Sequence, residues 1–294
     1  MQLRLVLLGG GNALGKALVR LGAEEDIAFL APKPEKGAWD ASSLTSLMDE
    51  VRPDAVINLA YYYDWFQAGA VDPDHFEPQE RAVERLAQLC KHHDCVLLQP
   101  SSYRVFDGMR ATAYNETSEC KPLSPRGKAL MRMEQSVRAL CSKHVLLRVG
   151  WLLDDSPDGM LGRVLHRAQD HELLEMADDR RGNPTPVEDA ARVILAILKQ
   201  LDCAAPLWGT YHYGGQEAAT ALSVAQAILA EAQAWRPELS QEVIARAHAS
   251  FADEKIEPQH GVLDSRKITH TFGIKPRAWR TGLADLLDSY YRNV

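Results

Sequence analysis

The stretch that decides the fold is LRLVLLGGGNALG, residues 3–15. Its first part, from Leu3 to Leu8, is mainly apolar, which is typical of a strand covered on both faces of a sheet. Three glycines follow directly, and the residues from Ala13 to Val19 have the apolar spacing of a helix. A buried strand that passes through a glycine turn into a helix predicts the first unit of an α/β protein.

Strands and helices then alternate through the first half of the chain. Because such an alternation forms parallel βαβ units, it predicts a doubly wound parallel sheet. The expected strands are Ile27–Ala31, Ala55–Ala60, a strand from Val96 and Val145–Val149, and the expected helices are Leu44–Glu50, Arg81–Cys90 and Met131–Leu140.

From about Leu152 this alternation stops and helices predominate. We expect them at Leu161–Gln169, Val187–Leu201, Ser223–Ala234 and Gln241–Ala249, with short extended pieces such as Gly209–Tyr213. The predicted fold is therefore α/β, with a Rossmann-type nucleotide-binding domain over residues 1–151. Residues 152–294 are expected to form a smaller, mainly helical domain packed at one edge of the sheet.

The composition is that of an ordinary globular protein, with 46% hydrophobic and 25% charged residues. The formal net charge of −7 argues against broad nucleic-acid binding, because no basic domain offsets it. No run approaches the roughly 20 apolar residues of a membrane span, and the first residues lead into the glycine turn, so we expect neither a membrane segment nor a signal peptide. The five cysteines form no CxxC motif, which favours reduced thiols in a cytoplasmic protein.

The glycine turn has the pattern GxxNxxG, from Gly9 to Gly15. Ligands of doubly wound sheets bind beyond the strand ends, where helix N-termini offer N–H groups to phosphate. Asn12 stands where a dinucleotide fold usually has its middle glycine. Asparagine tolerates left-handed backbone, but we expect its side chain to enter the phosphate path. The alternative is a tight turn without a ligand.

The residues after the second strand bear on which dinucleotide would bind. Ala31–Pro34 offers no acidic side chain for a ribose 2′-hydroxyl, whereas Lys33 or Lys36 could pair with a 2′-phosphate. This favours NADP(H) over NAD as the possible cofactor, although the lysines also fit an ordinary solvated surface.

Several longer segments carry a family resemblance. SSYRVFDG, residues 101–108, resembles the STDYVFDG segment of the dTDP-4-dehydrorhamnose reductases, and RVGW at 148–151 resembles their RTSW strand. DDRRGNPT at 178–185 resembles their DDQxGxPT turn, and further matches occur at Tyr114–Glu116, Pro122–Leu123, Leu263–Asp264, Phe272–Ile274 and Trp279. The similarity covers essentially the whole chain. It implies a Rossmann domain with a C-terminal substrate domain, and a relation to extended short-chain dehydrogenase/reductases that reduce nucleotide sugars with NAD(P)H.

The catalytic tyrosine and lysine of that family are missing. In the family, the tyrosine of a YxxxK pair protonates the alkoxide, and the lysine lowers its pKa. Ser102 keeps the position of the catalytic serine or threonine, but the tyrosine position falls on Arg126 and the lysine position on Leu130. Arginine does not release a proton near neutral pH. We expect Arg126 either to hold an acidic neighbour or to bind an anionic ligand group, unless it points into solvent.

The glycine turn and the resemblance together imply positions for both ligands. The candidate cofactor residues are Gly9, Gly11, Asn12, Ala13, Leu14, Gly15, Lys33, Asp40 and Ala60, and the candidate substrate residues are Tyr62, Ser102, Arg104, Val105, Trp151 and Arg180. No metal is expected, since neither HExxH nor a second His/Cys cluster accompanies His92 and His93. The aromatic run Tyr61–Phe66 is interpreted as a loop, either packed in the core or open to a protein partner.

Three hypotheses follow for the function. The first is a pseudoenzyme that binds NADP(H) or a nucleotide sugar and acts by binding or regulation. The second is an active NADPH-dependent nucleotide-sugar reductase or epimerase with a relocated general acid, such as Tyr61, Tyr62, Tyr63 or Tyr103. The third is a structural partner that has lost its ligands, for which Asn12 is the main support. A homodimer is left open by all three.

Overall fold

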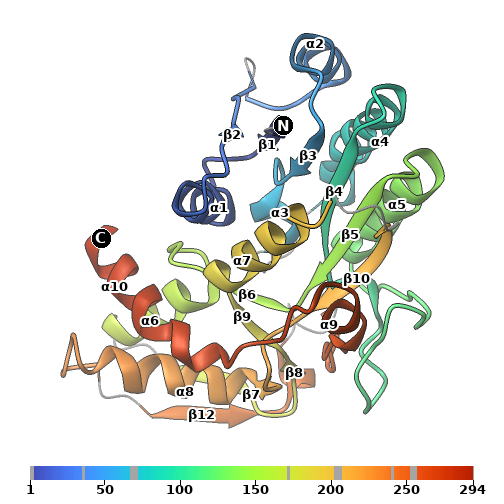
Figure 1. Cartoon of the computed structure of the whole chain (residues 1–294). Helices are drawn as coiled ribbons and strands as arrows, with labels where there is room; N and C mark the ends of the chain where they lie inside the picture. The colour runs from blue at the N-terminus through green and yellow to red at the C-terminus, as the bar shows by residue number, and fades with distance from the viewer. Residues whose placement is uncertain are drawn as a thin grey trace.

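A six-stranded, fully parallel sheet forms the centre of the protein (Figure 1). The structure, a computed structural model, describes residues 3–34, 37–66, 72–170, 173–201, 207–239, 242–251 and 257–293. The strand order is β10-β5-β4-β3-β1-β2. The strands are β1 (Leu5–Leu8), β2 (Phe29–Leu30), β3 (Ala55–Asn58), β4 (Val96–Ser102), β5 (His144–Val149) and β10 (Gly209–Tyr213). The predicted Rossmann-type α/β fold is confirmed.

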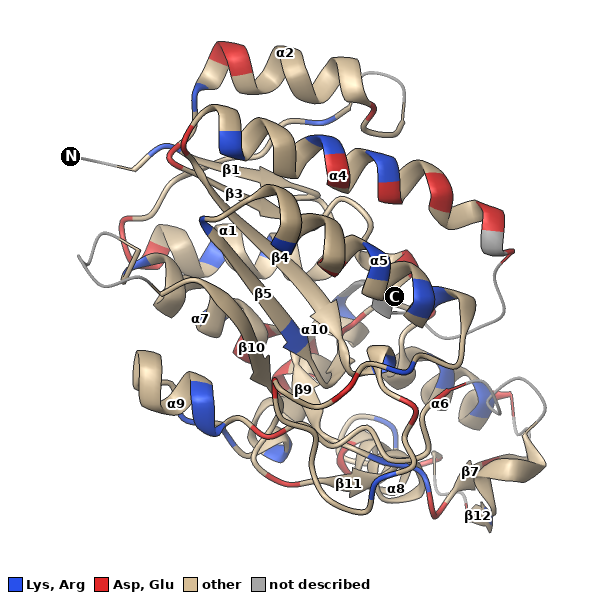
Figure 2. Cartoon of the chain, turned by 90° about the vertical axis from the view of Figure 1, so that its right-hand side faces the viewer, with Lys and Arg blue, Asp and Glu red and all other residues tan. Residues whose placement is uncertain are grey.

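Helices cover both faces of this sheet, which explains why β1, β3, β4 and β5 are buried along their whole length. On one face α1 (Ala13–Glu24) packs against α7 (Val187–Leu198), and on the other α4 (Glu77–His92) packs between α2 (Ala41–Val51) and α5 (Pro125–Leu140). The buried face of α4 carries residues at helical spacing, including Ala82, Leu86 and Cys90. Its outer face alternates acidic and basic residues (Figure 2).

The order of the strands indicates where a ligand-binding crevice would lie. The chain passes from β1 outward to β2 in one direction, and from β3 through β4, β5 and β10 in the other. The direction therefore reverses between β1 and β3, and ligands of such sheets bind beyond the strand ends at this point. The turn at Gly9–Gly11 follows β1, and Leu59–Ala60 follows β3.

Most of the chain after Trp151 forms the lower lobe in Figure 1. Its helices are α6 (Met160–Gln169), α8 (Ala221–Ala232) and α10 (Leu283–Asn293). Three strand pairs join them: β7 (Leu174–Ala177) with β12 (Val243–Arg246), β6 (Trp151–Leu153) with β9 (Pro184–Pro186), and β8 (Arg181–Gly182) with β11 (Ala219–Thr220). By contrast, α7 and β10 lie in the layers of the central sheet, and α9 (Arg266–Phe272) packs on β10. A two-domain division at residue 151 stays a prediction.

Two local predictions are wrong. Instead of a helix over Gln241–Ala249, the structure has strand β12, followed by a 3₁₀ helix at His248–Ser250. Pairing with β7 outweighs the weak helical spacing of this short segment. The aromatic run Tyr61–Phe66 contains a short helix, α3 (Tyr62–Phe66), rather than a loop.

Helix α3 turns part of its aromatic surface inward. Tyr62 and Trp65 are buried, whereas Tyr63 is 42% exposed and Tyr61 is half-buried. The surface proposed for a protein partner therefore rests on Tyr63 and part of Tyr61 among the described side chains, and such a partner stays a prediction. Within the described residues, no helix is both long and apolar enough to cross a membrane.

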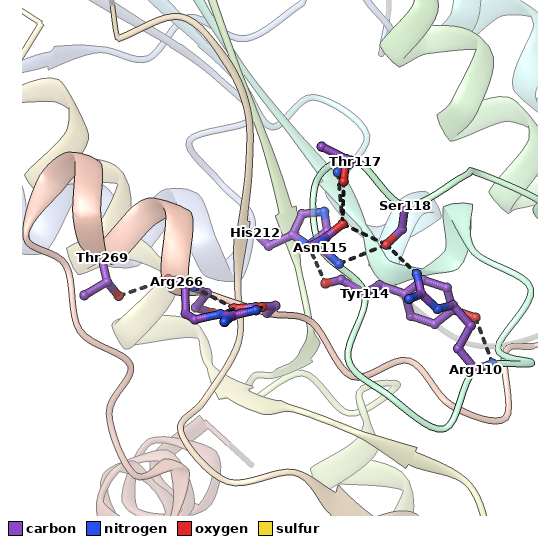
Figure 3. Close-up of polar contacts among 10 residues, drawn as sticks. Arg110, Tyr114, Asn115, Thr117, Ser118, His212, Arg266 and Thr269 are labelled. Atoms are coloured by element: carbon purple, nitrogen blue, oxygen red, sulfur yellow. Dashed lines mark hydrogen bonds and ion pairs between the residues drawn. The ribbon is translucent and has the colours of Figure 1, made fainter.

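The loop between β4 and α5 ties the C-terminal part of the chain to the sheet (Figure 3). The N–H of Tyr114 donates to the carbonyl of Val262 (2.8 Å), and its carbonyl accepts from the N–H of Asp264 (2.8 Å) and contacts His212 Nδ1 (3.0 Å). The phenol of Tyr114 stacks on Phe106. These contacts fix the segment after residue 257 beside the end of β4.

Candidate functional site

The glycine turn is closely packed against the loop after β3. Gly9 has φ +83°, and a Cβ there would lie 2.2 Å from the carbonyl oxygen of Leu59. A Cβ on Gly15 would lie 2.4 Å from the carbonyl oxygen of Gly9. Both positions therefore require glycine. Gly11, in contrast, faces open space, because a Cβ at this position would have no neighbouring atom within 4 Å.

Asn12 is tied to the backbone on both sides of this turn. Its side chain is only 7% exposed, and Oδ1 accepts a hydrogen bond from the N–H of Gly15 (2.9 Å), capping α1. Nδ2 donates to the carbonyl of Leu59 (2.8 Å). Both polar atoms therefore bind backbone groups and join the ends of β1 and β3, and the expectation that this side chain enters the phosphate path stays a prediction.

A large groove, of about 960 Å³, opens above this turn. Of the candidate cofactor residues, Gly9, Gly11, Asn12, Lys33 and Ala60 line it. Leu14 and Gly15 are buried in the helix contact and do not line it, and Ala13 also lies outside the lining set. Asp40 is absent from the lining too, because its carboxylate caps α2 by accepting from Ser43 N–H (2.8 Å). Lys36 lies outside the described residues.

The structure adds groove residues that the sequence did not single out for the cofactor. Lys16 stands one helical turn after Asn12 on α1, a spacing that could have revealed it. Trp39, Tyr61 and Tyr63 form an aromatic wall, in which the hydroxyl of Tyr61 donates to the carbonyl of Trp39 (3.2 Å). Burial raises the pKa of Tyr61 to about 12, so its hydroxyl stays protonated.

A second, smaller cavity of about 190 Å³ lies between the sheet and the lower lobe. Four candidate substrate residues line it, namely Tyr62, Arg104, Trp151 and Arg180, together with Tyr103, one of the possible relocated acids. Ser102 and Val105 do not line it, because both are fully buried. The structure adds further charged residues to the lining, namely Arg163, Arg167, Asp154 and Glu175.

Helix α3 lies between the two cavities. Tyr62 contributes to the smaller cavity, whereas its neighbours Tyr61 and Tyr63 contribute to the groove. The hydroxyl of Tyr62 donates to Asp154 (2.7 Å). The two cavities are therefore neighbours, as binding sites for a cofactor and its substrate must be.

The three positions that the resemblance assigns to the catalytic set are all closed to solvent: Ser102 is 0%, Arg126 4% and Leu130 1% exposed. Arg126 stands in the first turn of α5, which Ser124 caps by accepting from the N–H of Gly127 (3.0 Å). Leu130 packs one turn later in the core.

Arg126 is held in place by neighbouring groups. Its Nε donates to the carbonyl of Asp64 (2.5 Å), and its guanidinium lies 3.8 Å from a carboxylate oxygen of Glu257. Burial, with the nearby Arg104, lowers the pKa of Arg126 to about 10. Of the arrangements expected for Arg126, the structure shows the one with an acidic neighbour.

Glu257 is the centre of a buried ion cluster that the sequence did not reveal. Arg104 Nε donates to it at 2.7 Å, and Arg180 lies 3.8 Å from it. Although burial raises the pKa of Glu257, the three surrounding arginines outweigh that effect and lower it. The hydroxyl of Tyr103 contacts both Arg180 (3.2 Å) and Glu257 (3.4 Å).

Among the described residues, no group of His, Cys, Asp and Glu side chains is arranged to hold a metal ion. The polar groups that line the two cavities include guanidinium, ammonium, phenol and carboxylate groups, and the backbone of the glycine turn lines the groove. Such a set suits phosphate, carboxylate and sugar hydroxyl groups.

Proteins of similar sequence match almost the whole chain. The dTDP-4-dehydrorhamnose reductase of Aggregatibacter actinomycetemcomitans is 28% identical over 96% of this chain and 98% of that protein. The enzyme of the same name from Mycobacterium tuberculosis (strain H37Rv) is 27% identical over 97% of this chain and 92% of that protein.

Solved structures share the fold. A dTDP-4-dehydrorhamnose reductase from Clostridium acetobutylicum superposes with a TM-score of 0.84 at 21% identity, covering 98% of this chain and 99% of that one. The enzyme of that name from Bacillus anthracis, solved in complex with NADP, has a TM-score of 0.82 at 19% identity, covering 98% of this chain and 100% of that one. The family described as RmlD substrate binding domain matches residues 3–292. The chain therefore belongs to the RmlD substrate binding domain family.

Proposed function

We propose that this chain binds NADP(H) in the large groove and a nucleotide sugar in the smaller cavity, without reducing the sugar by the tyrosine–lysine chemistry of its relatives. The names of the relatives and the NADP complex of one solved neighbour support the choice of ligands. The groove also supports this choice of ligands, because the backbone of the glycine turn at the N-terminus of α1 lines it together with Lys16 and Lys33.

The observation that carries the non-catalytic part is the position of Arg126. The tyrosine of the family protonates an alkoxide, whereas Arg126 is buried, lies beside Glu257 and lines neither cavity. Arg126 also binds the carbonyl of Asp64, and Leu130 offers no charge to orient a nicotinamide ribose. In addition, Ser102 is fully buried and lines neither cavity.

The alternative is an NADPH-dependent nucleotide-sugar reductase or epimerase with a relocated acid. The names of the relatives favour this alternative over the non-catalytic proposal. Tyr62 and Tyr103 are the tyrosines on the smaller cavity. Burial, reinforced by Asp154, holds the pKa of Tyr62 well above its ordinary value, which makes this phenol a weaker proton donor than an ordinary tyrosine and counts against Tyr62 as the relocated acid.

One set of measurements distinguishes the non-catalytic proposal from the reductase or epimerase alternative. NADPH binding is measured by calorimetry, and NADPH oxidation is followed at saturating dTDP-4-keto-6-deoxy sugar. The proposal expects binding of NADPH without oxidation. Turnover of about 1 per second or more would refute it, and loss of that turnover in Tyr62→Phe or Tyr103→Phe would then identify the relocated acid. A chain that binds neither NADPH nor a nucleotide sugar would refute both. A cytoplasmic location and a homodimer stay predictions.

A further inference from the structure

Tyr63 stands where the large groove comes nearest to the smaller cavity. It follows Tyr62 in α3, and the two rings meet edge to face with their centroids 5.2 Å apart. Tyr62 lines the smaller cavity and Tyr63 lines the groove, and within the described part of the chain no residue lines both. The two phenols therefore belong to opposite sides of the partition that α3 forms between the cavities.

The hydroxyl of Tyr63 lies at the start of α1, where it interacts with the backbone N–H of Ala13. Ala13 is the first residue of this helix. The N–H groups of Gly15 and Lys16, in the same turn, donate to Asn12 (both 2.9 Å). Because N–H groups at the start of a helix bind phosphate, Tyr63 holds a donor that a phosphate in the groove would use.

The phenol of Tyr63 has room to move. Its side chain is 42% exposed, and the groove of about 960 Å³ opens beside it. The two preceding tyrosines are fixed: Tyr61 donates to the carbonyl of Trp39 (3.2 Å), and the buried Tyr62 donates to Asp154 (2.7 Å). Exposed side chains change rotamer within nanoseconds. Tyr63 can therefore leave the start of α1 while the rest of α3 stays in place.

A phosphate is a stronger partner for this N–H than the phenol is. Burial raises the pKa of Tyr63, and Asp154 and Asp155 raise it further, against the opposite effect of the N–H of Ala13. The hydroxyl is therefore neutral, whereas a phosphate accepts charge-assisted hydrogen bonds, which are about twice as strong. A phosphate can displace the phenol, but the contact with Ala13 must first be broken.

We propose that Tyr63 determines which ligands enter the groove: its hydroxyl occupies the N–H of Ala13 in the unliganded chain and must leave before the pyrophosphate of NADP(H) binds there. The affinity for such a ligand is lowered by the fraction of molecules in which Tyr63 has left. A ligand without a pyrophosphate at the start of α1 is not subject to this cost. The inference rests on the proposed binding of NADP(H) and adds to it a residue that sets the selectivity of the groove.

The test uses Tyr63→Phe, which keeps the ring and removes the hydroxyl. Calorimetry should show this variant binding NADPH about fivefold more tightly than the unchanged chain, the factor that corresponds to one ordinary hydrogen bond. Stopped-flow fluorescence should show the gain in the association rate constant, because a larger fraction of the molecules is open. As a control ligand, 2′-AMP, which lacks the pyrophosphate, should bind both chains alike.

Tyr211→Phe is the matched control variant. It also loses one phenol hydroxyl, which donates to the carbonyl of Leu207 (3.2 Å), and Tyr211 lines neither cavity. Its NADPH affinity should equal that of the unchanged chain. Tyr63→Leu removes the same hydroxyl as Tyr63→Phe and should show the same direction of change, so the test does not depend on the folding of one variant.

The outcomes distinguish the inference from the function on which it rests. If Tyr63→Phe binds NADPH equally or more weakly, the inference is overturned and NADPH binding stands. A gain that lies in the dissociation rate constant, or that 2′-AMP shares, also overturns it, because the hydroxyl then does not compete for the N–H of Ala13. If neither the unchanged chain nor the Tyr63 variants bind NADPH, the proposed function fails as well.

Discussion

Replacing Asn12 by alanine should destabilise the protein by about 2 kcal/mol. The change removes the cap of α1, which is typically worth ~1 kcal/mol, and the hydrogen bond from Nδ2 to the carbonyl of Leu59. That carbonyl still accepts from the N–H of Tyr62 (3.2 Å), so the second loss is the ~1 kcal/mol of an ordinary hydrogen bond rather than a full desolvation cost. For a chain of this length, ~2 kcal/mol corresponds to a fall in Tm of about 4 °C.

Two further variants separate the contributions. Asn12→Ser keeps an oxygen for the cap and loses only the bond to Leu59, so it should cost ~1 kcal/mol. Asn12→Gly should destabilise the protein slightly more than Asn12→Ser. It also loses the side-chain cap, and replacing a cap residue by glycine costs only a few tenths of a kcal/mol. Both are measured by urea denaturation, and NADPH affinity is measured on the same samples.

The structure also sets the direction of the binding change. Since the polar atoms of the Asn12 side chain hold the ends of β1 and β3 together at the floor of the groove, Asn12→Gly should weaken NADPH binding. A glycine variant of unchanged stability that binds NADPH more tightly would show that the asparagine obstructs the phosphates, as the sequence had suggested, and would refute the reasoning.

Three other changes have defined outcomes. Glu134→Gln should cost about 3–5 kcal/mol in urea denaturation, because it leaves the buried Arg148 without its carboxylate (2.6 and 2.8 Å); Glu80→Gln, at the exposed pair with Arg132, should cost less than about 1 kcal/mol. Burial and the neighbouring Arg148 lower the pKa of His212 from 6.5 to about 3, so the unfolded state binds a proton first and the free energy of unfolding should fall from pH 6.5 to 3. His212→Asn should flatten this fall, and an unchanged slope would contradict the assignment. Gly261→Ala places a Cβ 2.4 Å from the ring of Tyr103, so it should weaken nucleotide-sugar binding by about tenfold or more while NADPH binding in the other cavity is unchanged, both by calorimetry.

The sheet could be predicted because its signals are local. Each buried strand is a short apolar run, and in the glycine turn after the first strand Gly15 is required by a contact with Gly9, six residues earlier, although Gly9 itself is required by a contact with the distant Leu59. The segment 241–249 shows the limit of such signals. Its residues carry a weak helical spacing, and only the neighbouring strand β7, far away in sequence, decides that Val243–Arg246 is extended.

The orientation of Asn12 could not be predicted for a related reason. The pattern GxxNxxG marks the turn, but it does not show where the side chain points. The partner that decides this is the carbonyl of Leu59, 47 residues away. A side chain that satisfies both a helix N-terminus and a strand end is held more firmly than one that only caps the helix.

The buried Arg126 lies beside the buried Glu257, although the sequence analysis singled out only Arg126 as a site residue. At the position of the family tyrosine, an arginine buried to 4% exposure needs an opposite charge. That charge comes from a segment fixed by other contacts: the carbonyl of Glu257 contacts His248 Nε2 (3.2 Å), and Gly108, with φ +72°, lies against Pro258. Glu257 binds Arg104 from 153 residues away, a distance at which no motif links the two. A change at Arg126 therefore concerns a whole cluster of charges, because Arg104 and Arg180 contact the same carboxylate.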